Sequence, residues 1–134
     1  MREEPSIIEK IVAGLSYLTM GMVGFIWLII GLFTKARLKT FLQFHIFQSI
    51  FIALAYTVIA LLVGWISNIL SIIPFINKVV AQITFLLNMP LLFNYSFIQI
   101  ILYGFIFYLA IQAFRGKYSY IPWISEIIGQ NISR

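Results

Sequence analysis

The stretch TFLQFHIFQSIFIALAYTVIALLVGWI, residues 40–66, contains no charged side chain over its whole length. About 20 apolar residues suffice for a helix to cross the roughly 30 Å of bilayer hydrocarbon. The same stretch nevertheless keeps Gln43, His45 and Gln48, whose side chains form strong hydrogen bonds. It therefore predicts a membrane helix whose polar groups need partners.

The composition of the whole chain supports a membrane protein. Of the 134 residues, 62% are hydrophobic and 10% are charged, and the mean hydropathy is +1.02, whereas about 25% of a soluble domain is charged. The net charge of +5 is scattered among apolar segments, so we expect no nucleic-acid partner and anionic lipid headgroups as counter-charge. No signal or transit peptide pattern precedes the first apolar segment. We expect one integral membrane domain over residues 1–134.

Four apolar segments predict an all-α bundle of four transmembrane helices, at about residues 8–34, 40–66, 69–89 and 94–115. Ser6 and Glu9 form a capping-box pattern at the start of the first. The third is short or re-entrant, because Pro74 and Pro90 leave only about 23 Å of helix between them.

A C-terminal interfacial amphipathic helix is predicted at about residues 122–132. Pro122 suits its first turn, and Trp123, Ile127 and Ile128 recur at helical spacing. Glu126 is expected to face water or to pair with a basic residue of another segment.

Small residues on the first span predict a helix-packing face, with a substrate-lining groove as the alternative. They lie within about a third of the helix circumference and are Gly14, Gly21, Gly24 and Gly31.

Chemistry-bearing residues are scarce. The chain has one His, no Cys and no Asp, so no catalytic, cofactor-binding or metal-binding residues are predicted and we expect no enzyme. Ser16, Ser49 and Ser96 do not lie in a Gly-x-Ser-x-Gly elbow.

Polar side chains form stripes on the predicted spans. One stripe lies on the second span and another on the fourth, with one member on the third. We expect the stripes to satisfy each other and His45 and Gln48 to face protein rather than lipid. They either lock helices together or line a path, and they comprise His45, Gln48, Ser49, Tyr56, Gln82, Tyr95, Gln99 and Tyr103.

Two segments resemble a known family. FLQFHIFQSIFI, residues 41–52, and IQAFRGKYSYIPWISEII, residues 111–128, are similar to the signatures of the twenty-kilodalton subunit family of Tic, the protein-import translocon of the chloroplast inner envelope, and of its bacterial homologues. The matching residues are Phe41, Phe44, His45, Gln48, Gln112, Arg115, Gly116, Tyr118, Ile121, Pro122, Ile124, Ser125 and Glu126.

The resemblance implies a four-helix membrane protein with both termini on one side that forms or supports a polypeptide path in a translocation complex. The alternative is a small structural or assembly protein that binds larger membrane partners. Expected partners are the lipid bilayer, other membrane proteins or further copies, and polypeptide cargo.

The expected location is a bacterial plasma membrane or plastid inner envelope, with cytoplasmic or stromal termini. Four spans place the basic loop at residues 35–39 opposite the termini, although three crossings would satisfy the positive-inside rule better. The resemblance favours four.

Overall fold

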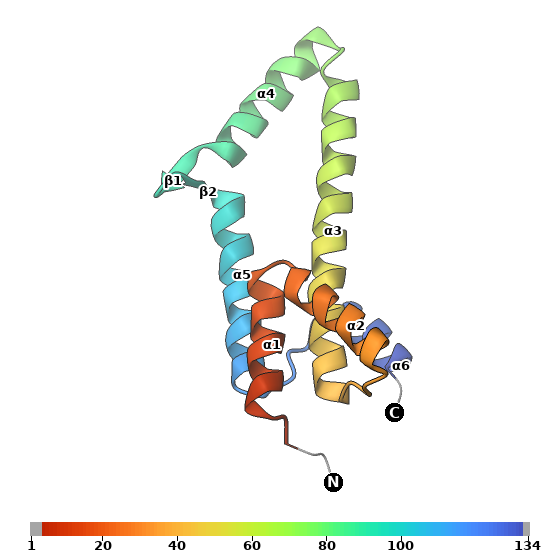
Figure 1. Ribbon diagram of the computed structural model, residues 1–134. Coiled ribbons are helices and arrows are strands. Elements are labelled where there is room, and N and C mark those ends of the chain that lie inside the picture. Colours follow the sequence, from red (N-terminus) through yellow and green to blue (C-terminus); the bar gives the residue numbers. More distant parts are fainter. Residues whose placement is uncertain (1–3, 133–134) are drawn as a thin grey trace. The chain divides into compact units, whose positions relative to one another are not determined.

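The computed structural model describes residues 4–132, which are mostly helical (Figure 1). They divide between a first unit, within residues 1–54 and 106–134, and a second unit, residues 55–105. Two of the described helices, α3 (Thr40–Leu70) and α5 (Phe97–Phe114), are long and apolar enough to cross a membrane. The elements are α1 (Ile7–Leu18), α2 (Met22–Thr34), α3 (Thr40–Leu70), α4 (Pro74–Asn88), β1 (Pro90–Leu92), β2 (Tyr95–Ser96), α5 (Phe97–Phe114) and α6 (Ile124–Asn131).

The predicted first span is wrong as a single helix, because the chain breaks between α1 and α2. α1 begins at the predicted capping box, in which the Glu9 amide donates to Ser6 Oγ at 3.3 Å and the Ser6 amide donates to Glu9 Oε2 at 2.7 Å. It ends at Leu18, and the backbone then turns through Met20 and Gly21 at φ 54° and 87°. Glycine adopts this left-handed region without steric cost.

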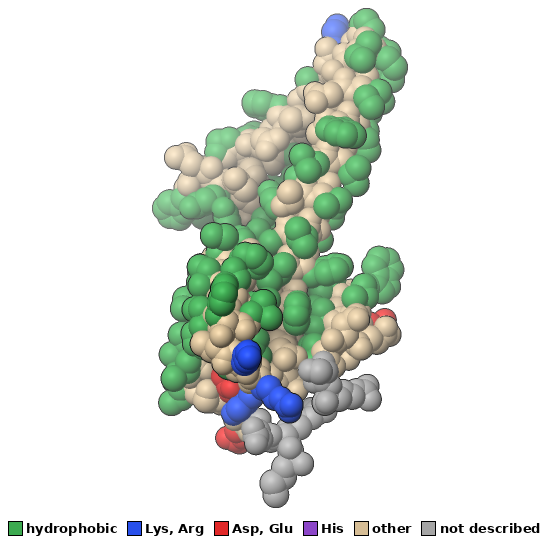
Figure 2. Space-filling model, turned by 45° about the vertical axis from the view of Figure 1, so that its right-hand side comes forward, with side chains coloured by type: hydrophobic (Ala, Val, Ile, Leu, Met, Phe, Trp, Pro, Cys, Tyr) green, Lys and Arg blue, Asp and Glu red, His purple; other side chains and the backbone are tan. Residues whose placement is uncertain are grey.

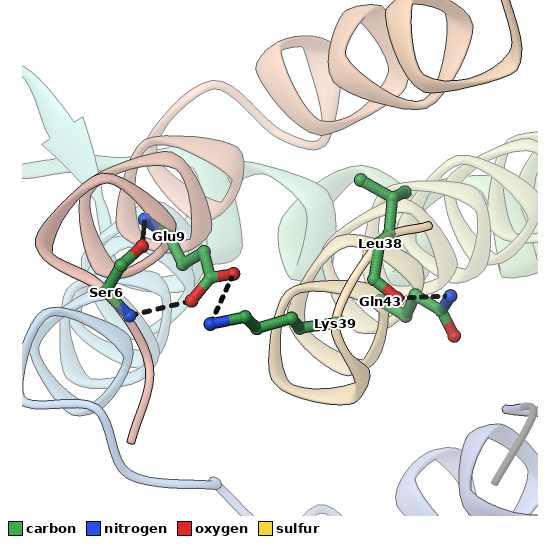
Figure 3. A network of polar contacts seen from close by, with 5 residues as sticks. All are labelled: Ser6, Glu9, Leu38, Lys39 and Gln43. Atoms are coloured by element: carbon green, nitrogen blue, oxygen red, sulfur yellow. Dashed lines mark hydrogen bonds and ion pairs between the residues drawn. The ribbon is translucent and has the colours of Figure 1, made fainter. Parts of the chain in front are cut away.

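The segment from α1 to α2 leaves one end of the first unit and returns to it. Glu9 Oε1, in the first turn of α1, lies 3.6 Å from Lys39 Nζ, just before α3 (Figure 3). α2 ends only five residues before Lys39. α1 and α2 have 12 and 13 residues, or about 18 and 20 Å each, and neither matches the roughly 30 Å of hydrocarbon.

The glycines allow close packing at separate places rather than along one helix face. A Cβ on Gly14 would lie 2.4 Å from the ring of Phe114, which ends α5. A Cβ on Gly24 would lie 2.8 Å from Ser16 Oγ and 2.9 Å from Ile46. The break at Gly21 changes the helix direction, so the predicted common face does not form.

The second unit has almost no core. Among residues 55–105, all of which the structure describes, Ser96 alone is buried. Pro74 opens α4 as predicted, and α4 ends one residue before Met89. Hydrophobic side chains cover much of the face seen in Figure 2.

The start of the predicted fourth span is wrong. Tyr95 and Ser96 pair antiparallel with β1 instead of joining the helix, after a turn with Phe93 and Asn94 at φ 46° and 67°. α5 then starts at a second capping pair, in which the Ser96 amide donates to Gln99 Oε1 at 2.9 Å and the Gln99 amide donates to Ser96 Oγ at 3.4 Å.

Candidate functional site

A buried polar cluster lies in the first unit and is called the Gln48 cluster. Its members are Tyr17, His45, Gln48, Ser119 and Ser125. α1 supplies Tyr17, α3 supplies His45 and Gln48, α6 supplies Ser125, and Ser119 belongs to the loop between α5 and α6. His45 and Gln48 have no exposed surface. The cluster therefore joins three helices and the loop between α5 and α6 through buried side chains.

Gln48 is the centre of the cluster. Its Nε2 donates to the Ser119 carbonyl oxygen at 3.1 Å and to Ser125 Oγ at 3.0 Å. Its Oε1 accepts from Ser119 Oγ at 3.1 Å and from the Tyr17 hydroxyl. A primary amide has two donor hydrogens and two acceptor lone pairs, so every hydrogen-bonding position of this side chain is used.

His45 is held less completely. Its Nδ1 lies 2.8 Å from the Tyr17 hydroxyl oxygen. The Tyr17 hydroxyl also donates to Gln48 Oε1, and the ring tautomer decides whether His45 Nδ1 donates to this hydroxyl or accepts from it. Nε2 is buried and has no partner in hydrogen-bond geometry among the described residues, although the Lys117 main chain lies beside the ring.

Aromatic rings surround the imidazole. The ring of Phe41 meets it edge-on at a centroid distance of 4.5 Å, and the ring of Phe44 does so at 5.3 Å. Tyr118 stacks on it at 5.8 Å with an interplanar angle of 20°. Contacts of this kind contribute about 0.5–1.5 kcal/mol each beyond area burial, so packing orients His45 as much as hydrogen bonding does.

Ser125 connects the C-terminal tail, residues 118–132, to the cluster through hydrogen bonds. Its Oγ accepts from the Ile121 amide at 2.7 Å and also contacts the Ser119 carbonyl at 3.4 Å. Further along the tail, Ile128 and Ile132 pack on Phe44 as a small hydrophobic core. Ile128 thus packs against protein, whereas the sequence pattern predicted that it lies on the membrane surface.

The predicted start of the tail helix is wrong. α6 begins at Ile124, and Pro122 lies outside it, because Trp123 takes a φ of 67° and a ψ of −50°. Trp123 is 81% exposed and Ile127 is 46% exposed. These two side chains therefore do not belong to the buried face.

Glu126 is exposed and has a partner that the sequence did not indicate. The Tyr120 hydroxyl donates to its Oε1 at 2.8 Å. This hydrogen bond raises the pKa of Tyr120 above its ordinary value, because ionisation would remove the donated hydrogen and place two negative charges together.

The hydrogen bonds described for the two predicted polar stripes lie within one unit or the other. The side chains and main-chain groups that hydrogen-bond His45 and Gln48 belong to the first unit, whereas the Gln99 side chain caps α5 within the second. Ser49 donates back to the Ile46 carbonyl of its own helix at 2.8 Å. The remaining stripe residues lie in the second unit and are Tyr56, Gln82, Tyr95 and Tyr103, the last two in edge-on ring contact at 5.5 Å.

The two segments that carry the family resemblance come together. Phe41 and Phe44 of the first segment contact Tyr118 of the second at ring-centroid distances of 5.4 and 5.1 Å. Gly116, at φ 72°, turns the chain out of α5 so closely against α1 that a Cβ there would lie 2.7 Å from Lys10. The Gln112 carbonyl accepts from the Lys117 amide at 2.9 Å and helps to close this turn.

Tyr17 and Ser119 were missed by sequence reasoning. Tyr17 sits in an apolar run, and Ser119 sits in a loop between tyrosines, so neither residue belongs to a recognisable sequence pattern.

Sequence comparison supplies no further constraint on the site, because no protein-family model, curated protein or solved structure matches the chain. Among residues 4–132 no three His, Cys, Asp or Glu side chains gather.

Proposed function

We propose that this chain is an integral membrane protein in which α3 and α5 cross the bilayer. The observation that carries this proposal is the exposure of apolar surface: in the most apolar stretch of each helix, 22% of the residues are buried in protein. α3 alone has 31 residues, or about 46 Å of helix. A monomeric soluble protein rarely exposes apolar patches above a few hundred Å², so hydrocarbon is the environment that these side chains fit.

In the proposed topology, α1 and α2 form a re-entrant hairpin and the basic residues share one side of the membrane. Lys39 contacts Glu9 at the start of α1, and Lys10 packs against Gly116 after α5. Six of the seven described Lys and Arg residues fall within a few positions of these contacts, the exception being Lys78. The positive-inside rule assigns this end to the cytoplasm or stroma, in a bacterial plasma membrane or a plastid inner envelope.

Cysteine accessibility tests this topology, and the chain contains no native cysteine. The positions Ala36, Ile72 and Tyr120 are all exposed. In sealed vesicles, Ala36→Cys and Tyr120→Cys should react with an impermeant maleimide from the same side, and Ile72→Cys from the other. Labelling of Ala36→Cys and Tyr120→Cys from opposite sides would support four crossings instead.

For its biochemical role, we propose that the chain is a component of a protein-translocation complex. In this role it supports a polypeptide path, and the Gln48 cluster does not line that path. The translocation part rests on the resemblance of residues 41–52 and 111–128 to the Tic subunit family. The supporting part rests on the Gln48 amide, which has no hydrogen-bonding position left for a passing polypeptide. The alternative is an assembly protein that binds stable membrane partners through the exposed helices of the second unit.

Photocrosslinking with an arrested translocation substrate separates these roles. A photoreactive amino acid at Gln82 or Gln99, both exposed, should capture the arrested polypeptide if the chain supports a path. Capture of resident membrane proteins alone would favour the assembly role. The same probe at His45 is the matched buried control, and capture of substrate from there would contradict the supporting role.

A further inference from the structure

A groove of about 640 Å³ lies between α2 and the start of α3, entirely within the first unit. Its apolar lining includes Leu28, Leu32 and Phe47, and its polar lining is Arg37 and Gln43. This volume falls in the range of about 300–1,000 Å³ that is usual for small-molecule sites. The combination suits a ligand with a charged end and an apolar body.

The loop that carries Arg37 is fixed at its α2 end. Lys35 adopts a left-handed conformation at φ 51°, and the Ala36 amide donates to the Gly31 carbonyl at 3.2 Å. The Lys35 amide also lies 3.4 Å from the Leu32 carbonyl, which completes a Schellman pattern. Arg37 therefore follows directly after an ordered helix end.

The other end of the loop is also fixed (Figure 3). Gln43 Nε2 donates to the Leu38 carbonyl at 2.9 Å, and Lys39 extends toward Glu9 on α1, away from Gln43. The Gln43 bond uses one donor of the amide and leaves Oε1 available as an acceptor. A hydroxyl group of a ligand can donate a hydrogen bond to Gln43 Oε1.

The charge of Arg37 is not compensated within the part of the chain that the structure describes. Its basic neighbour Lys39 pairs with Glu9, whereas Arg37 forms no ion pair among residues 4–132. Guanidinium groups bind phosphate through paired hydrogen bonds. An anionic phosphate is the chemistry that complements this end of the groove.

We propose that the groove binds one anionic phospholipid with a hydroxylated headgroup, of the phosphatidylglycerol type. The phosphate contacts Arg37, a headgroup hydroxyl donates to Gln43, and one acyl chain lies along Leu28, Leu32 and Phe47. This inference rests on the proposed membrane integration, because only there does the groove meet lipid. A bound lipid of this kind would help to hold the α2–α3 loop at headgroup level.

Native mass spectrometry of the detergent-purified full chain tests the site, with phosphatidylglycerol and phosphatidylcholine as probes. We expect one preferred phosphatidylglycerol per chain. Arg37→Gln should weaken it about fivefold, since one basic residue contributes about 1 kcal/mol to anionic-lipid binding. Lys78→Gln removes the same charge from α4 and is the matched control. Equal binding of both lipids, or equal losses in the two variants, would overturn the proposal.

Three further measurements test the acyl-chain contact, the need for a whole lipid and the membrane integration. Leu32 is 79% exposed, so Leu32→Gln should keep the melting temperature while weakening phosphatidylglycerol binding through the apolar wall; unchanged binding would count against the acyl-chain contact. Displacement by soluble glycerol phosphate would reduce the site to a simple anion site and refute the lipid proposal. Extraction of the chain from membranes by alkaline carbonate would refute integration itself, independently of the Arg37 result.

Discussion

Replacing Gln48 by leucine should destabilise the protein far more than replacing His45 by phenylalanine. Both substitutions remove a fully buried polar side chain, and both keep an apolar group of similar size. They differ in what they leave behind. The Gln48 amide serves four hydrogen bonds, whereas the His45 side chain bonds Tyr17 and has a buried Nε2 without a partner among the described residues.

The difference in the free energy of unfolding follows from the hydrogen-bonding groups that each substitution leaves without a partner. Without Gln48, Ser125 keeps the Ile121 amide and Tyr17 keeps His45, but Ser119 Oγ loses its acceptor. A buried hydroxyl without a partner costs about 1–3 kcal/mol, and the lost Tyr17 bond adds about 1 kcal/mol. We expect a total of about 2–4 kcal/mol. The His45→Phe change removes one bond together with a buried nitrogen that has no partner among the described residues, and should cost less than about 1 kcal/mol.

Reversible unfolding in mixed detergent micelles, followed by far-ultraviolet circular dichroism, measures both costs. The double variant Gln48→Leu with Ser119→Ala provides the internal control, because it removes the stranded hydroxyl and should recover about 1 kcal/mol or more. A His45→Phe cost equal to or above that of Gln48→Leu would refute the assignment of Gln48 as the centre. A double variant no more stable than Gln48→Leu would refute the stranded-hydroxyl account.

Two further predictions concern packing and pKa. Gly14→Ala should destabilise by about 1–3 kcal/mol, because its Cβ would meet the Phe114 ring, whereas Gly64→Ala, with nothing within 4 Å, should be neutral or stabilising; equal melting temperatures would contradict the close contact. Glu126→Gln should lower the pKa of Tyr120 toward its ordinary value, read by carbon NMR of the ring. Below about pH 10 the Tyr120 bond is fully present, and its contribution is lost as pH rises through the raised pKa, so an unshifted titration in the variant would refute the pairing.

Local signals in the sequence predicted the elements that local chemistry controls. The Ser6–Glu9 box starts α1, and Pro74 starts α4. The uncharged run from residue 40 forms one long helix, although it continues to Leu70, four residues past the predicted end. Each of these features depends on residues within one or two helical turns of each other, so a single sequence carries them.

Features that depend on tertiary contact were not predictable in the same way. Gly21 lies in an apolar run where glycine is equally compatible with a straight membrane helix, and the reversal is visible only through its φ of 87°. Helical periodicity placed His45 and Gln48 on one face but could not say what faces them. Their partners, Tyr17 and Ser119, are 31 and 71 residues from Gln48.

The contrast between the two units bears on how the protein would act. In the first unit, the Gln48 cluster and the core of Phe44, Ile128 and Ile132 hold the tail against α3 through contacts within the chain. In the second unit, residues 55–105 bury only Ser96, so packing inside that unit contributes little to its order. In the proposed topology, hydrocarbon or a neighbouring protein supplies the contacts that its apolar side chains lack. Variants on exposed apolar positions of α4 should therefore disturb complex formation while leaving the melting of the first unit unchanged, and variants of the Gln48 cluster should do the opposite.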